Sequence, residues 1–161
     1  LHTGDIGVFD AEGFLIITDR KKHLFKTTGG KYIAPTPIEN LFLASKYIDQ
    51  FVLIGDRRMF LSALIVPDFD AVKEYADAHR IQYNSVQDLL ESKQIYEMLE
   101  KELGQFPKRL ANYERVRKFK ILDQPFSIET GEMTPSLKLK RKVIEERYGD
   151  LIEDMYKGMT E

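Results

Sequence analysis

The sequence predicts an α+β domain, and three observations lead to that class. Short β-type apolar runs fill the first part of the chain, a helical period of apolar residues follows, and a strand-like alternation returns near residue 116. A chain of 161 residues is long enough to bury one sizeable core without disulfides or a structural metal. We therefore expect strands and helices packed around one main core.

A β-hairpin is predicted at the start of the chain. Residues 7–10 and 14–18 are two short β-type runs, and the segment between them carries Asp10 and Gly13, which favour a tight turn. The charged segment 19–23 then separates two apolar runs. We expect the boundary between two structural units in that segment.

Further strands are predicted in the middle and later parts of the chain. Residues 51–55 and 61–66 are two apolar runs, and the polar residues 56–58 between them supply a turn. Residues 116–122 alternate apolar and basic side chains. That alternation predicts a half-buried strand with a basic outer face.

Apolar residues at helical spacing predict the helices. They cover residues 35–43, a segment that begins at Asp68, residues 92–111 and a short segment around 139–149. Pro37 suits a first helical turn, and the Asp68 carboxylate can cap its helix by accepting backbone N–H bonds. Pro107 is expected to kink the third helix or to end its first half.

Composition narrows the function classes. The net charge is −2, from 24 Lys and Arg against 26 Asp and Glu, which excludes a strongly basic nucleic-acid binder and an acidic disordered tail. The absence of cysteine excludes a disulfide framework, a thiolate metal site and a cysteine nucleophile. We expect no membrane span, because no apolar run reaches roughly 20 residues, and we see no signal-peptide pattern at the start of the sequence. Because Leu1 is not a methionine, we expect a piece of a longer protein.

Some residue types that carry chemistry recur along the chain. His2, His23 and His79 lie far apart, without the close ligand pairs of zinc sites, so no metal site is expected. Carboxylates that could serve a function are Asp5, Asp10, Asp19 and Glu39. Residues 27–31 are consistent with a glycine turn or with an anion site, but they lack the spacing of a nucleotide-binding P-loop.

The basic cluster at residues 138–142 has three interpretations. It can be the solvated start of a helix, with Glu145 pairing with Arg141 at i, i+4. It can be an anion site for phosphate or another acidic surface. It can also belong to a loop that delivers one lysine, Lys138, into an active site. The residues by themselves leave these alternatives open.

Three stretches of the sequence together carry a family resemblance. They are Leu1-His2-Thr3-Gly4-Asp5; residues 19–26 leading into Gly29-Gly30-Lys31-Tyr32-Ile33-Ala34-Pro35 with Ile38-Glu39; and Gly131-Glu132-Met133-Thr134-Pro135-Ser136-Leu137-Lys138-Leu139-Lys140-Arg141. In this order they resemble the last three signature motifs of the adenylate-forming enzymes, which include acyl-CoA synthetases, firefly luciferase and peptide-synthetase adenylation domains. The long helical stretch 68–113 and the Thr-Pro-Ser-Leu-Lys-Leu-Lys-Arg ending resemble the long-chain fatty-acid CoA ligases.

The resemblance implies a fold and a division of the chain. It implies a small mixed sheet flanked by helices, the C-terminal lid domain of these enzymes, at residues 23–161. Residues 20–22 would be the hinge, and residues 1–19 would be the terminal hairpin of a large N-terminal domain. The rest of that domain, with its phosphate loop and acyl pocket, would be the main partner of this chain.

The resemblance also implies roles in nucleotide binding and domain rotation. Asp5 would accept hydrogen bonds from the ribose hydroxyls of ATP, because a carboxylate offers two acceptor oxygens. Arg20 would contact the same ribose region, and Lys22 would lie at the hinge about which the small domain rotates between half-reactions. The sequence departs from the family pattern at His2 and His23, where many relatives carry an aromatic residue and a carboxylate.

Lys138 would be the catalytic residue. It matches the lysine that approaches the α-phosphate and the acyl carboxylate during adenylation, where a cation offsets the charge that develops as the carboxylate attacks phosphorus. After rotation, the loop that contains Gly29 and Gly30 would line the pantetheine tunnel of CoA. A side chain at these glycines would block close approach.

For the full-length enzyme the resemblance implies a long-chain fatty-acid CoA ligase, which converts fatty acid, ATP and CoA to acyl-CoA, AMP and pyrophosphate through an acyl-adenylate. ATP, Mg²⁺ and CoA would serve that enzyme, whereas this chain alone would be inactive, with no metal site and no bound cofactor. We expect a cytoplasmic protein that binds no nucleic acid, with peripheral membrane contact left open. The alternatives are an adenylate-forming ligase for another carboxylate, and a stand-alone module that binds an anionic partner or membrane through residues 116–122 and 138–142.

Overall fold

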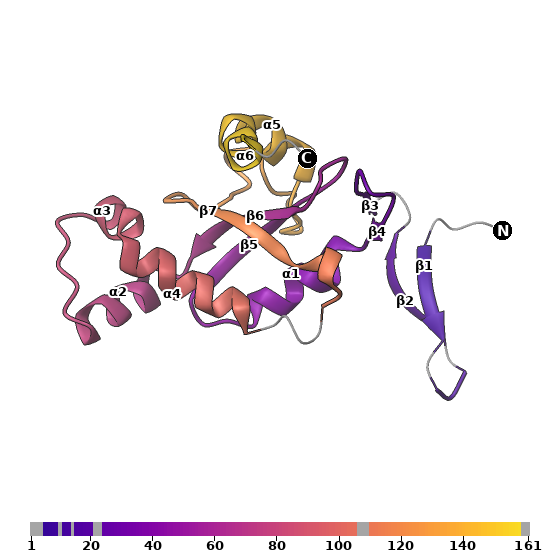
Figure 1. The fold of residues 1–161 in the computed structure, drawn as a ribbon, viewed down its shortest axis with the longest axis horizontal. Coiled ribbons are helices and arrows are strands. Elements are labelled where there is room, and N and C mark those ends of the chain that lie inside the picture. The colour runs from indigo at the N-terminus through magenta and orange to yellow at the C-terminus, as the bar shows by residue number, and fades with distance from the viewer. Residues whose placement is uncertain (1–4, 10, 14, 21–23, 106–109, 159–161) are drawn as a thin grey trace.

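Among the described residues, a three-stranded mixed sheet lies at the centre of the fold (Figure 1). Its strands are β5 (Ile48–Ile54), β6 (Leu61–Pro67) and β7 (Val116–Ile121), in that spatial order. β5 pairs antiparallel with β6, and β6 pairs parallel with β7. The computed structural model describes residues 5–9, 11–13, 15–20, 24–105 and 110–158.

The burial of each strand follows its place in the sheet. β6 is the central strand, and all seven of its residues are buried. A mostly apolar run suits this position because both faces of a central strand are covered. In the edge strand β7, Phe119 is buried, whereas Arg117 is exposed and Lys118 is half-buried. The predicted half-buried strand is confirmed, but its basic residues do not share one outer face: Arg117 lies on the same side of the strand as buried Phe119, and Lys118 and Lys120 lie on the other side.

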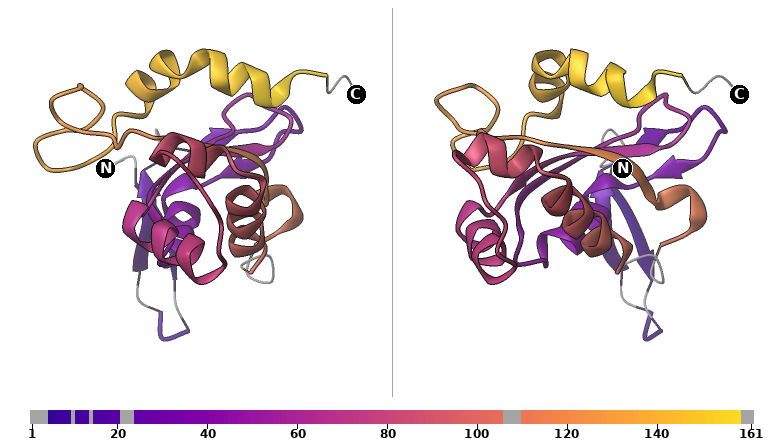
Figure 2. Two further views of the ribbon diagram at one scale, coloured as in Figure 1. Left: turned by 90° about the vertical axis from the view of Figure 1, so that its left-hand side faces the viewer. Right: turned by 60° about the vertical axis from the view of Figure 1, so that its left-hand side comes forward.

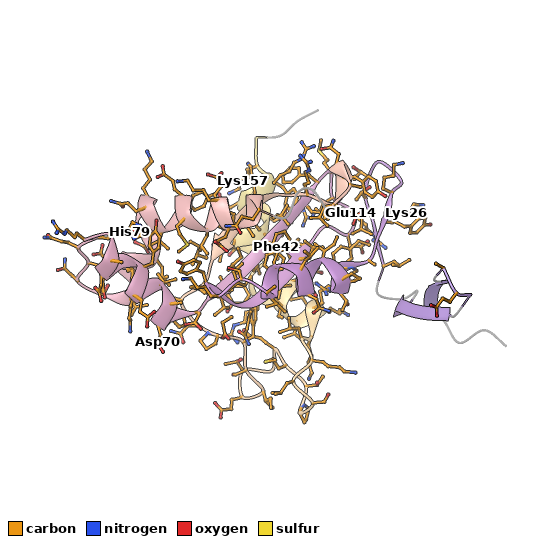
Figure 3. All side chains as sticks on the ribbon, turned by 90° about the horizontal axis from the view of Figure 1, so that it is seen from below. Lys26, Phe42, Asp70, His79, Glu114 and Lys157 are labelled. Atoms are coloured by element: carbon orange, nitrogen blue, oxygen red, sulfur yellow. The ribbon has the colours of Figure 1, made fainter. Side chains whose placement is uncertain are left out.

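A group of helices between residues 35 and 104 covers one face of the sheet. These helices are α1 (Pro35–Leu43), α2 (Phe69–Ala78), α3 (Val86–Glu91) and α4 (Lys93–Gly104). Phe42 of α1 stacks on Phe51 of β5 with ring centroids 4.7 Å apart, and Leu99 of α4 joins the same buried cluster. Figure 3 shows Phe42 at the centre of the packed side chains.

Helices α5 (Arg141–Arg147) and α6 (Gly149–Tyr156) cover the opposite face, as both views of Figure 2 show. The strand β5 supplies both clusters because its side chains alternate between the two faces. Leu53 belongs to the cluster under α1–α4, whereas Val52 packs with Ile144 and Ile152 of the last two helices. A small mixed sheet flanked by helices confirms the predicted α+β class.

Short hairpins precede this three-layer unit. β1 (Asp5–Phe9) pairs antiparallel with β2 (Leu15–Arg20), and β3 (Phe25–Lys26) pairs antiparallel with β4 (Tyr32–Ile33). The β1–β2 hairpin lies beside the three layers rather than within them (Figure 1). None of the helices among the described residues combines the length and the apolar character needed to cross a membrane.

The predicted helix at 92–111 is too long at its C-terminal end. α4 ends at Gly104, and residues 110 and 111 are not helical; Pro107 lies outside the described residues. The predicted start is correct, since the Ser92 hydroxyl accepts a bond from the Ile95 N–H at 3.4 Å. The preceding helix α3 was not predicted, although Ser85 and Asp88 provide a capping signal at its start.

The predicted helix around residues 139–149 corresponds to α5, which ends at Arg147, close to the predicted end. It is not the last helix, because α6 begins at Gly149. Leu139 lies outside the helix, in an isolated antiparallel bridge with Met133. A leucine at helical spacing from Val143 looks the same in the sequence whether it belongs to a helix or packs beside one.

Candidate functional site

The β1–β2 hairpin brings together the two residues expected to bind ribose. Asp5 and Arg20 are direct partners in the antiparallel register, at the open end of the hairpin. Directly opposed residues of an antiparallel pair have Cα atoms about 4.5–5.5 Å apart. The backbone therefore places the two positions side by side. The expected hinge residue Lys22 lies outside the described residues.

The glycine loop, residues 27–31, connects β3 to β4 and closes on itself. The Thr27 N–H donates to the Lys31 carbonyl at 2.9 Å, and the Gly30 N–H donates to the Thr27 carbonyl at 2.9 Å. Gly30 has φ of +81°, a conformation that side-chain-bearing residues rarely adopt. Gly29 has no such constraint, and a Cβ placed there would approach only the Thr27 hydroxyl, at 3.9 Å. Gly30 is therefore required by the turn, whereas Gly29 leaves open space.

The turn between β5 and β6 supports the glycine loop through the backbone. The Thr28 N–H donates to the Arg58 carbonyl at 3.1 Å, and the Arg57 N–H donates to the Lys26 carbonyl at 2.9 Å. The Asp56 carboxylate accepts from the Lys26 N–H at 3.1 Å. Lys26 lies at the end of the domain nearest the β1–β2 hairpin (Figure 3).

The lysine loop, residues 134–138, presents Lys138 to solvent. The Thr134 N–H donates to the Lys138 carbonyl at 2.8 Å, and the Lys138 N–H donates to the Thr134 hydroxyl at 3.0 Å. The Ser136 hydroxyl lies 2.9 Å from the Thr134 hydroxyl. Leu137 has φ of +63° and is 66% exposed, so a bulky residue adopts the left-handed region beside the lysine. The segment between β7 and α5 extends from the body of the domain (orange to gold in Figure 2).

The ammonium group of Lys138 is available to a ligand. Its residue is exposed, and no ion pair within the described part of the chain involves it. The side chain therefore has an ordered base and an uncommitted charge. That combination suits a residue that meets an anion from outside the domain.

A buried carboxylate anchors the N-terminal stem of the lysine loop. Glu132 is 1% exposed; one of its oxygens accepts from the Thr130 hydroxyl at 2.8 Å, and the other lies 3.2 Å from Arg147 Nε. The Lys140 N–H donates to the Glu132 carbonyl at 2.7 Å and closes the stem. Burial raises the pKa of the nearby Tyr148 hydroxyl above its usual range, and the Glu132 charge raises that pKa further.

A second buried carboxylate holds the C-terminal stem. Arg141 Nη1 lies 2.7 Å from Glu39 Oε1 of α1 and donates to the Leu53 carbonyl at 2.9 Å. Its guanidinium carbon lies 5.1 Å from the centroid of the Phe25 ring. Arg141 therefore pairs with the distant Glu39 rather than with Glu145, its i, i+4 neighbour in the helix. Burial raises the pKa of the Glu145 carboxyl, and Arg141 only partly opposes that rise.

The apolar stripe of α1 contains a signal for this pair. The buried residues of α1 are Pro35, Ile38, Glu39 and Phe42, which follow one helical stripe. A glutamate on that stripe must be buried, and a buried carboxylate requires a cationic or hydrogen-bonding partner. The sequence does not predict that the partner is Arg141, because that residue lies 102 positions further along the chain.

Comparison with known protein families decides the identity of this domain. A family model described as the AMP-binding enzyme C-terminal domain matches residues 22–160. The chain belongs to this family. The predicted resemblance to the C-terminal part of adenylate-forming enzymes is thereby confirmed.

Curated relatives of this AMP-binding C-terminal domain are named as fatty-acid ligases. It is 37% identical over 96% of its length to the long-chain-fatty-acid–CoA ligase FadD15 of Mycobacterium tuberculosis, and 38% identical over 97% to the long-chain-fatty-acid–CoA ligase 6 of Rattus norvegicus. The matched residues are 26% and 23% of those two proteins. The chain therefore spans about a quarter of the length of these relatives.

Solved structures resemble the domain over almost its whole length. The adenylation domain of a carboxylate reductase from Mycobacterium chelonae superposes with a TM-score of 0.76 at 28% identity, covering 96% of this chain and 22% of that chain. The A domain of the carboxylic acid reductase from Segniliparus rugosus, in complex with AMP and a co-purified carboxylic acid, gives a TM-score of 0.70 at 28% identity, covering 96% and 23%. These matches agree with the family and the fold.

Proposed function

We propose that these residues form the C-terminal part of a longer ATP-dependent long-chain fatty-acid–CoA ligase. The observation that carries the proposal is 37–38% identity, over almost the whole chain, to enzymes named as such ligases. The parent reaction joins a fatty acid to AMP with release of pyrophosphate, and CoA then displaces AMP to give acyl-CoA. The chain contributes one loop to each step.

Lys138 serves the first step in this proposal. When a carboxylate attacks the α-phosphorus of ATP, negative charge increases on the phosphoryl oxygens and on the leaving pyrophosphate. A fixed ammonium group stabilises that charge more strongly in the transition state than in the ground state. The ordered loop and the exposed position of Lys138 support this role.

The glycine loop serves the second step. Thiol attack on the acyl-adenylate needs a narrow passage for the pantetheine arm of CoA, and Gly29 leaves the wall of such a passage without a side chain. The open space beyond Gly29 supports this assignment. The same domain would present the lysine loop first and the glycine loop after rotation.

The rotation defines the proposed division of the chain. Residues 1–19 belong to the end of a large N-terminal domain, residues 20–22 with Lys22 form the hinge, and residues 23–161 form the lid. Asp5 and Arg20 hold the ATP ribose on the side of the large domain. Their direct pairing in the hairpin supports a shared ligand.

The magnesium ion that accompanies ATP is assigned to no residue of this chain. Within the described ranges, no three or more carboxylates, histidines or cysteines converge on a point that could hold a metal ion. ATP, CoA and the fatty acid are substrates in this proposal. Most of their binding surface belongs to the large domain.

The structural matches favour one further candidate, the adenylation domain of a carboxylic acid reductase, since the M. chelonae domain gives a TM-score of 0.76. Both candidates imply an acyl-adenylate, so Lys138 would have the same role. They differ in the acceptor, because a ligase transfers the acyl group to free CoA.

The full-length protein that carries this chain tests both candidates. Pyrophosphate exchange into ATP should depend on hexadecanoate and should be much slower with benzoate or an amino acid. Free CoA should then release AMP and give hexadecanoyl-CoA. Exchange that prefers another carboxylate would contradict the substrate class, and adenylation without transfer to CoA would favour the reductase. The 161 residues alone should catalyse neither step.

A further inference from the structure

The ion pair of Glu39 and Arg141 connects helix α1 to the residue where α5 begins. Glu39 is 7% exposed, and its Oε1 accepts from both Arg141 Nη1 at 2.7 Å and the Leu53 N–H at 3.0 Å. Arg141 Nη1 also donates to the Leu53 carbonyl at 2.9 Å. The carboxylate and the guanidinium are therefore both fixed to the same backbone position of β5.

Arg141 lies only three residues beyond Lys138. Between them, Leu139 bridges to Met133 and the Lys140 N–H donates to the Glu132 carbonyl. Every residue from 138 to 141 thus has a fixed backbone or side-chain partner. The Arg141 guanidinium therefore connects the C-terminal stem of the lysine loop to α1 and β5.

Stability alone does not explain such a pair. Removing two charges from water carries a large desolvation penalty, and apolar side chains of similar volume often stabilise a fold equally well. An arginine–carboxylate contact gives directional specificity that apolar packing lacks. The lysine loop, which directly precedes Arg141, is the feature that such a directional contact would orient.

In the described part of the chain, the glycine loop makes no hydrogen bond to Glu39 or Arg141; the nearest link is the Phe25 ring of β3, 5.1 Å from the Arg141 guanidinium carbon. The Thr27 hydroxyl and backbone bonds to the turn at residues 56–58, through the Thr28 and Arg57 N–H groups, hold the loop. Loss of the Glu39–Arg141 pair should therefore displace the lysine loop and leave the glycine loop in place.

We propose that Glu39 and Arg141 are positioning residues that hold the lysine loop in register for adenylation. They act through Lys138 and need not touch substrate themselves. The inference rests on the proposed function, because it assigns adenylation to Lys138.

The test uses the full-length enzyme and measures both half-reactions. For Glu39→Gln, kcat for hexadecanoate-dependent pyrophosphate exchange should fall about 10- to 100-fold, since a misplacement of about 1 Å has effects of that size. The KM for ATP and the rate of thioester formation from supplied acyl-adenylate should change less than about threefold. Arg141→Lys should show the same selective loss, because lysine lacks the planar fork.

A double variant separates positioning from folding. In Glu39→Gln/Arg141→Met no buried charge is left unpaired, and the glutamine amide can both accept from and donate to the Leu53 backbone. We expect a thermal unfolding temperature close to that of the wild type, with adenylation still reduced. Asp154→Asn is the control, because it breaks the Lys120–Asp154 pair between β7 and α6, which involves neither loop nor the turn at residues 56–58. Both half-reactions should be unchanged in that control.

The outcomes distinguish the positioning role of Glu39 and Arg141 from the proposed function of the whole enzyme. A folded double variant that adenylates at the wild-type rate would overturn the positioning role, and so would equal losses in both half-reactions. In either case an active wild type would leave the proposed function intact. A wild-type enzyme that adenylates no carboxylate would overturn the proposed function and this inference with it.

Discussion

The glycine loop and the lysine loop of this domain are closed in the same way but anchored differently. In the glycine loop, residues 27–31, the Thr27 hydroxyl accepts from the Lys31 N–H at 3.2 Å; in the lysine loop, residues 134–138, the Thr134 hydroxyl accepts from the Lys138 N–H at 3.0 Å. Backbone hydrogen bonds to the turn at residues 56–58 anchor the glycine loop, whereas the buried carboxylates Glu132 and Glu39 anchor the stems of the lysine loop. The position of the first loop therefore depends mainly on backbone contacts, whereas the position of the second depends on charged side chains.

This difference predicts how substitutions act. A substitution beside the glycine loop should act through space that a ligand needs, without changing the loop itself. A substitution around the lysine loop should act through the position of Lys138. The two half-reactions should therefore respond to different parts of the domain.

Removal of the Lys138 amine should have the largest effect. Lys138→Ala should slow adenylation about 100- to 1000-fold, the usual loss when one preorganised electrostatic contact to a transition state is removed. Fatty-acid-dependent pyrophosphate exchange measures this rate. Lys138→Arg keeps the positive charge but replaces the ammonium group by a planar guanidinium, so it should recover part of the adenylation rate. An alanine variant with wild-type exchange would remove the lysine loop from adenylation.

Obstruction at Gly29 should have the next largest effect. Gly29→Leu should slow thioester formation from supplied acyl-adenylate roughly 10- to 100-fold, because the new side chain would occupy the path of pantetheine. The fold should persist, since a Cβ at Gly29 would meet only the Thr27 hydroxyl, at the ordinary contact distance of 3.9 Å. Gly104→Leu is the control, at another exposed glycine without a positive φ. Unchanged thioester formation in Gly29→Leu would contradict a CoA passage at this loop.

The hydroxyl that closes the lysine loop should have a smaller effect. Thr134→Ala removes the acceptor for the Lys138 N–H, a contact of about 1 kcal/mol. Adenylation should fall about fivefold, and thioester formation should be unaffected. Thr134→Ser retains the oxygen and should behave as the wild type. If the serine and alanine variants were equally slow, the methyl group rather than the hydrogen bond would matter.

The smallest effect concerns Glu145, whose charge interacts with Arg141 beyond the lysine loop and with Asp56 and Arg58 of the turn that supports the glycine loop. Burial raises the folded-state pKa of Glu145, so its favourable contribution is present below the unfolded pKa and is lost as pH rises through the folded pKa. Glu145→Gln should therefore raise the free energy of unfolding at pH 7 by roughly 0.5 kcal/mol.

Urea unfolding of the chain at two pH values measures this contribution. The gain from Glu145→Gln should disappear near pH 4, below the ordinary glutamate pKa. A gain of equal size at both pH values would show that the Glu145 charge is not responsible.

The sequence was sufficient to predict the first hairpin and the three strands of the central sheet, because apolar runs and alternation are local signals. The two-residue strand β4 is too short to show either signal. The sequence also located both loops, since Gly29, Gly30 and Lys138 belong to recognisable motifs. It could not predict that Arg141 pairs with Glu39, because the i, i+4 partner Glu145 was an equally good local choice. Only the packing of α1 against β5 brings the distant carboxylate to Arg141 and leaves Glu145 without that pair.

The separation of the two loops is tested most directly by single-turnover rates of both half-reactions in Lys138→Ala and Gly29→Leu of the full-length enzyme. We predict a crossed result, in which Lys138→Ala loses adenylation and retains thioester formation, and Gly29→Leu does the reverse. A parallel result, in which each variant loses both half-reactions to the same degree, would contradict the assignment of one loop to each step.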